Sequence, residues 1–83
     1  MYLVEHYRPG LSAEGLRNAA DLLRRVAGAM ASEGSDVRYV RATIVPSDEA
    51  MLALFEAGSE SIVRDAYARA GIACERITVA VSA

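Results

Sequence analysis

The 83-residue chain has one cysteine, Cys74, one histidine, His6, and no tryptophan. A single thiol cannot form an intrachain disulfide, and the two residues together fall short of the roughly four nitrogen or sulfur ligands of a structural zinc site. The spacings HxH, HExxH and CxxC are absent from the sequence. These absences exclude a disulfide scaffold and argue against an intrachain metal centre, and they predict a reducing, cytoplasmic setting.

Positive charge is also in short supply, since 11 acidic and 9 basic side chains give a net charge of −2. This balance gives no electrostatic support for a nucleic-acid partner. No apolar run approaches the roughly 18 residues of a membrane span, and no charged segment precedes an apolar one at Met1. We therefore expect neither a membrane partner nor a secretory signal. The scattered glycines form no phosphate-binding loop, which leaves nucleotide binding without support.

Hydrophobic residues are plentiful, at 53% of the chain against 24% charged residues. This composition predicts one globular domain over residues 1–83. A domain of this size buries only about 60% of the surface that its unfolded chain exposes, and this one has no disulfide to compensate. We therefore expect the chain to assemble with itself.

Two amphipathic helices are predicted from the spacing of apolar residues. Ser12 is placed to cap the first helix and Ser59 the second, while Gly34 and Gly71 suit the left-handed position that ends each of them. The apolar stripes repeat every three or four residues, as a helix that covers a core requires. The first stripe contains Leu16, Ala19, Ala20, Leu23, Val26, Ala27 and Met30, and the second contains Ile62, Val63, Ala66, Tyr67 and Ala70.

Four segments rich in β-branched and aromatic residues predict strands. They are Tyr2 to Arg8, which stops at Pro9-Gly10, then Val37 to Val45, Ala50 to Glu56 and Ile72 to Val81. Pro46-Ser47-Asp48 joins the second and third strands as a tight hairpin connection. The resulting order is βαββαβ, which predicts a ferredoxin-like α+β sandwich: a four-stranded antiparallel sheet with two helices on one face. The bare face would be covered in a homodimer that forms an α+β barrel.

Strand periodicity assigns side chains to the two faces of this sheet. In the second strand, Tyr39, Arg41 and Thr43 are predicted on the bare face, because Val40, Ala42 and Ile44 form an apolar set suited to the helices. The first strand is ambiguous, with Glu5 on one face and His6 on the other. We favour Glu5 on the bare face, since Val4 would then pack against the helices.

The residues that bear chemistry lie on adjacent segments of the predicted sheet. Glu5, Tyr39 and His6 are the candidate catalytic residues, because a carboxylate, a phenol and an imidazole can move protons to and from a small organic acid or ketone. The candidate ligand-binding residues are Tyr7, Arg41 and Glu56. The alternative interpretation is that these groups form hydrogen bonds and ion pairs at a dimer interface.

His6 and Cys74 each admit two interpretations. His6 has a pKa near neutrality, so it could shuttle protons or bind a metal, or share a metal with Glu5 across a dimer axis. The alternative is a half-buried strand histidine held by a hydrogen bond. Cys74 could be activated by Arg76, two residues away, or be an inert buried thiol.

The segments YLVEHYRPG (2–10), VRYVRAT (37–43), LFEA (54–57) and AGI (70–72) resemble a bacterial family of small ferredoxin-like domains. The family is usually labelled nickel-binding-protein-like, after an actinobacterial member. The resemblance covers nearly the whole chain. It implies the ferredoxin-like fold and a homodimer in which the two sheets face each other, and it raises nickel as a cofactor, for which His6 is the candidate ligand.

The sequence thus favours a dimeric domain that binds a small organic molecule, or less readily a divalent metal, at the sheet face. The alternative is a cofactor-independent isomerase, cyclase or lyase that acts on a small metabolite by acid–base catalysis, an analogy with other dimeric ferredoxin-like barrels. A purely structural or regulatory interaction protein is the third candidate.

Overall fold

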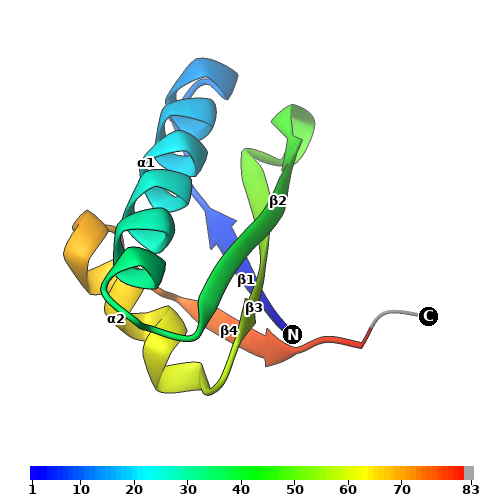
Figure 1. Cartoon of the computed structure of the whole chain (residues 1–83). Helices are drawn as coiled ribbons and strands as arrows, with labels where there is room; N and C mark the ends of the chain where they lie inside the picture. The colour runs from blue at the N-terminus through cyan, green and yellow to red at the C-terminus, as the bar shows by residue number, and fades with distance from the viewer. Residues whose placement is uncertain (82–83) are drawn as a thin grey trace.

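The computed structural model describes residues 1–81, and its elements follow the predicted order (Figure 1). The strands are β1 (Tyr2–Tyr7), β2 (Val37–Val45), β3 (Ala50–Ala57) and β4 (Arg76–Val79), and the helices are α1 (Ala13–Ser32) and α2 (Glu60–Ala70). A single 3₁₀ turn, Pro46–Asp48, connects β2 to β3. The ferredoxin-like prediction is confirmed.

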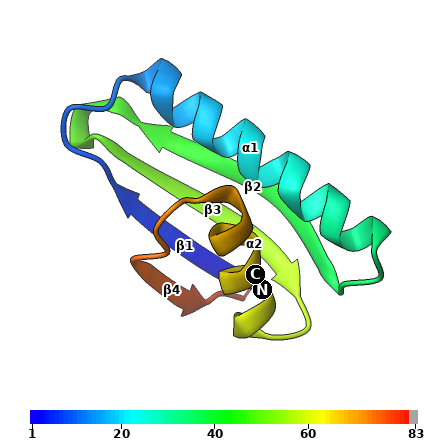
Figure 2. The same cartoon turned by 90° about the vertical axis from the view of Figure 1, so that its left-hand side faces the viewer.

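The four strands form one antiparallel sheet in the order β2-β3-β1-β4. Both helices lie on the same side of this sheet and leave its other side without cover (Figures 1 and 2). In the register of the central strands, Val4 of β1 lies opposite Ala53 of β3 and Ile77 of β4. Because side chains alternate along a strand, this row of residues shares the helix-covered face.

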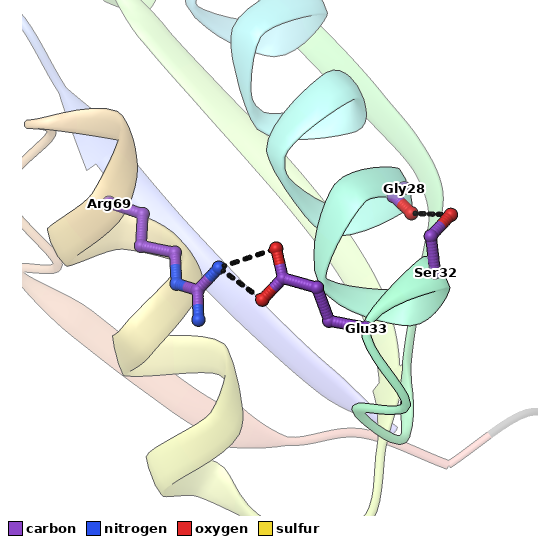
Figure 3. A network of polar contacts seen from close by, with 4 residues as sticks. All are labelled: Gly28, Ser32, Glu33 and Arg69. Atoms are coloured by element: carbon purple, nitrogen blue, oxygen red, sulfur yellow. Dashed lines mark hydrogen bonds and ion pairs between the residues drawn. The ribbon is translucent and has the colours of Figure 1, made fainter.

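The predicted caps and stripes are present in both helices. Ser12 accepts a hydrogen bond from the Gly15 backbone N–H at 3.1 Å, and Gly34, with φ +98°, follows the end of α1. Ser59 occupies the N-cap of α2, but its hydroxyl bonds Ser61 and not the helix backbone. Arg69 of α2 donates to both carboxylate oxygens of Glu33, which ties the two helices together at the surface (Figure 3).

The core fills the space between the helices and one face of the sheet. Phe55 and Tyr67 meet edge to face there, with ring centroids 5.8 Å apart. The buried apolar residues are Val4, Leu16, Leu23, Ala27, Met30, Val37, Met51, Ala53, Phe55, Val63, Ala66 and Tyr67. Both predicted stripes contribute to this set. Within residues 1–81, no helix has the length and apolar character that crossing a membrane requires.

A β-bulge in β2 corrects one predicted face assignment. The pairing of β2 with β3 shifts between Tyr39 and Arg41, so Val40 is an extra residue that breaks the alternation. Tyr39 therefore lies on the helix side, where its ring meets Phe55 edge to face at 5.7 Å. Arg41 and Thr43 remain on the uncovered face, as predicted. The assignment of Tyr39 to that face was wrong because a bulge leaves no trace in a strict two-residue period.

The last strand is shorter than predicted. The expected strand from Ile72 to Val81 is reduced to β4, and residues 72–75 are irregular. The Ile72 N–H donates to the Tyr67 carbonyl at 3.0 Å, so the chain is still completing the end of α2 there. At the other end of β4, the Ala80 N–H donates to the Met1 carbonyl at 2.9 Å, which continues the contact with the start of the chain.

Two glycines give opposite expectations for stability. Gly28 lies inside α1 with open space around a built Cβ, so Gly28→Ala should stabilise the fold by about 0.5–1 kcal/mol. Gly34 has equal space but a positive φ, so Gly34→Ala should destabilise it by about 1 kcal/mol. Urea unfolding at one protein concentration measures both free energies. Equal effects of the two substitutions would contradict the assigned end of α1.

Candidate functional site

The sheet face opposite the helices, called the open face below, contains the candidate site. It is built from alternate residues of all four strands, out of phase with the buried row of Val4 and Ala53. Its members are Leu3, Glu5, Tyr7, Arg38, Arg41, Thr43, Val45, Ala50, Leu52, Leu54, Glu56, Arg76 and Thr78. Most of these side chains are partly or fully exposed, in contrast to the dry opposite face.

A groove of about 350 Å³ crosses the open face, and we call it the leucine groove. Its lining residues are Met1, Leu3, Arg41, Thr43, Leu52, Leu54, Ala80 and Val81. The strand register explains its composition, since Arg41 lies opposite Leu54, and Leu54 lies opposite Leu3. The next row places Thr43 opposite Leu52. The groove therefore has an apolar floor on β3 and β1 and a polar wall on β2.

A second depression of about 330 Å³ adjoins the groove and shares Leu52 with it. Its other lining residues are Glu5, His6, Tyr7, Ala50, Glu75 and Arg76. Tyr7 is 61% exposed, so its phenol is available to a ligand or a partner. This end of the open face has two carboxylates, whereas the leucine groove has none among its lining residues.

Cross-strand ion pairs hold both carboxylates that the sequence singled out. Glu5 lies 3.2 Å from the Arg76 guanidinium on the neighbouring strand, and Glu56 lies 3.0 Å from that of Arg38. These pairs are solvent-exposed, so each contributes little to stability. Both carboxylates therefore already have a cationic partner within the same chain.

The structure brings some of the predicted site residues together and separates others. Glu5, Tyr7 and Arg41 share the open face, in the two adjoining depressions. Glu56 is on the same face but beyond the end of β1, outside both depressions. His6 and Tyr39 point to the helix side. The three candidate catalytic residues are therefore not one constellation.

His6 is buried, with 3% of its surface exposed, and its ring stacks on Tyr67 with centroids 5.1 Å apart. Its Nε2 and the Tyr67 hydroxyl share a hydrogen bond of 2.6 Å. Burial, assisted by the nearby Arg8 charge, lowers the pKa of His6 to about 4, and burial raises the pKa of Tyr67. Both groups are thus neutral at pH 7. His6 behaves as the hydrogen-bonded strand histidine of the second interpretation.

Metal-ligating side chains do not converge in the described part of the chain. No group of three or more His, Cys, Asp or Glu residues is close enough to hold an ion within residues 1–81. Glu5 and His6 project from opposite faces of β1, which separates the two side chains considered for a metal shared across a dimer axis. Cys74 is half-buried and burial raises the pKa of its thiol, while Arg76 pairs with Glu5.

Sequence reasoning missed the three leucines that form the floor of the groove. Leu52 and Leu54 alternate with Met51, Ala53 and Phe55, so β3 is apolar on both faces and its pattern assigns neither. The signal that would have found them is the register itself, which aligns Leu3 and Leu54 with the polar residues of β2. Tyr67 was expected only as part of a helix stripe, not as the partner of His6.

The His6–Tyr67 pair predicts a pH dependence of stability. The pKa of His6 falls from 6.5 to about 4 on folding, so below pH 6.5 the unfolded chain binds a proton that the folded chain refuses. This contribution should lower the free energy of unfolding by about 3 kcal/mol between pH 6.5 and pH 4, and not at all above pH 7. Urea unfolding of wild type and His6→Gln isolates it. An equally steep loss in both proteins would contradict the assignment.

Comparisons with known proteins agree with the fold and with the resemblance drawn from the sequence. A crystal structure of SCO4226 from Streptomyces coelicolor A3(2) superposes with a TM-score of 0.73 and 21% sequence identity, over 99% of this chain and 98% of that one. No curated protein matches the sequence. The family model described as "Nickel responsive protein SCO4226-like" matches residues 2–79. The chain therefore belongs to the SCO4226-like family of nickel responsive proteins.

Proposed function

We propose that this protein is a homodimeric binding domain that holds a small organic molecule between two open faces. The observation that carries the proposal is the leucine groove, a cavity of about 350 Å³ on the uncovered side of the sheet. Small-molecule sites are concave, mostly apolar, and carry a few polar groups that orient the ligand. The leucine groove has this composition in one chain, and a second chain would close it.

Burial of apolar surface supports the dimer. Leu3, Leu52 and Leu54 are only partly buried, although they are adjacent and occupy the middle of the sheet. Covering them would contribute about 25 cal/mol for each Å² of apolar surface removed from water. A stable interface needs about 800 Å² from each partner, roughly a sixth of the 4877 Å² of surface that one chain exposes. One side of a two-layer domain can supply that area.

The ion-paired carboxylates of the open face are compatible with this arrangement. Glu5 and Glu56 are already neutralised by Arg76 and Arg38 within the same chain. A second copy can therefore approach without bringing unpaired carboxylates face to face, which would cost binding energy. The ion pairs flank the leucines, as the polar rim of an interface flanks its apolar centre.

The geometry favours binding over acid–base catalysis. An isomerase, cyclase or lyase mechanism needs a base within reach of the substrate and a second group to complete the proton transfer. Glu5 is held by Arg76, and the other two catalytic candidates, His6 and Tyr39, lie behind the sheet. Of the other candidate residues, Tyr7 lines the same depression as Glu5 with its side chain exposed.

Nickel is the metal that the family description implies, and the donors of this chain do not fit it. Nickel is bound well by imidazole and thiolate ligands. The single imidazole is buried against Tyr67, and the single thiol has a raised pKa that disfavours the thiolate. The described residues form no cluster of three donors. We therefore assign this chain no nickel-dependent step.

Nickel binding should accordingly be weak or absent. Calorimetric titration of the purified protein with Ni²⁺ should show no stoichiometric binding in the submicromolar range, because too few nitrogen and sulfur donors converge. Cys74→Ser and His6→Ala should titrate like wild type. Submicromolar binding that disappears in His6→Ala would contradict this expectation and make a nickel site the leading function.

Light scattering at micromolar concentration tests the dimer. Wild type should have twice the mass of one chain, and Leu52→Glu should be a folded monomer, because a charge in the leucine groove cannot be buried without a partner. Val79→Glu is the matched control: the same charge on an exposed strand residue of the helix side. Val79→Glu should remain a dimer. A monomeric wild type would contradict the proposed function.

A further inference from the structure

The chemical class of the ligand follows from the charges around the leucine groove. We infer that the groove takes a monocarboxylate with an apolar body, whose carboxylate is bound by Arg41 and Thr43. This inference rests on the proposed function, since it takes the leucine groove to be the ligand site. It adds the chemical class of the ligand, a monocarboxylate.

Arg41 differs from the other arginines of the sheet. Six of the nine basic residues, all arginines, have a carboxylate within ion-pair distance: Arg8, Arg24, Arg38, Arg64, Arg69 and Arg76. Within residues 1–81, Arg41 has none, although the other two arginines of the open face, Arg38 and Arg76, are both paired. Arg17 and Arg25 also lack a carboxylate in this part of the chain, but they lie on α1 and do not line the leucine groove. The leucine groove therefore contains one uncompensated guanidinium.

A guanidinium in this position selects for a planar anion. Its parallel N–H donors match the two oxygens of a carboxylate, and charge-assisted bonds of this kind are among the strongest hydrogen bonds in proteins. Thr43 lies two residues along the same face of β2 and lines the same groove, so its hydroxyl can donate to the same anion. Because Arg41 is the one charged side chain among the residues that line the groove, a ligand with one negative charge would neutralise it.

The rest of the groove defines the body of the ligand. From β2, the row of Arg41, Leu54 and Leu3 crosses β3 and reaches β1. Two inter-strand spacings amount to about 10 Å, which is the length of a short alkyl chain that ends in a phenyl ring. The leucine side chains offer that body no hydrogen bonds.

A matched pair of probes tests this inference. The probes are 4-phenylbutyrate and its uncharged isostere 4-phenylbutanamide, titrated into the ¹⁵N-labelled full-length protein by NMR. The proteins are wild type, Arg41→Gln and Arg25→Gln, the last of which removes an arginine that also lacks a carboxylate partner within residues 1–81 but lies outside the groove. Wild type should bind the carboxylate at least about tenfold more tightly than the amide, with shifts at Leu3, Leu52 and Leu54. Arg25→Gln should keep this preference.

The outcomes separate the inference from the proposed function. Loss of the preference in Arg41→Gln, with amide binding unchanged, supports the inference. Equal binding of the two probes to wild type, or no shift in the groove up to about 10 mM, overturns it. Light scattering of the same samples reports the dimer independently. If wild type is a dimer without a preference for the carboxylate, the inference is wrong and the proposed function is retained. If wild type is a monomer that prefers the carboxylate, the proposed homodimer is wrong and the inference is retained.

Discussion

Two helices cannot cover both faces of a four-stranded sheet, and this constraint organises the whole protein. Helices α1 and α2 pack on one face and bury Val4, Ala53 and Phe55 completely. The alternation of strand side chains then places Leu3, Leu52 and Leu54 on the other face, where residues 1–81 provide no layer to cover them. An apolar centre without a cover is what a second copy or a ligand would bury. The proposed dimer and the proposed ligand site are both consequences of that single imbalance.

Polar groups follow the same division between a dry and a wet face. On the helix-covered side, His6 and Tyr67 share a hydrogen bond, and burial lowers the pKa of His6. On the open face, Glu5 and Glu56 each form an ion pair with an arginine of a neighbouring strand. Arg41 has no such partner within residues 1–81, and it lines the leucine groove together with apolar residues. The likeness to SCO4226, at 21% identity, shows the fold.

The sequence predicts the regular elements well and the site only in part. Both helices are predictable because their apolar residues repeat at helical spacing and because each helix is followed by a glycine with positive φ. These glycines are Gly34 and Gly71. The bulge at Val40 is invisible, because it is a property of pairing between strands and changes no residue type. The strict two-residue alternation therefore predicted the wrong face for Tyr39. The His6–Tyr67 contact joins residues 61 positions apart, and the apolar character of β3 on both sides concealed the leucines of the groove.

The central claim is that the open face is covered in solution, and the methyl groups of its leucines report this most directly. A soluble paramagnetic agent broadens the NMR signals of methyls that solvent can reach. If a second copy covers the face, the methyls of Leu3, Leu52 and Leu54 are protected at high protein concentration and lose that protection on dilution. Leu11 is the internal reference, since it is 40% exposed and lies on the helix side. Broadening of the three groove leucines as strong as that of Leu11 at every concentration would contradict the account.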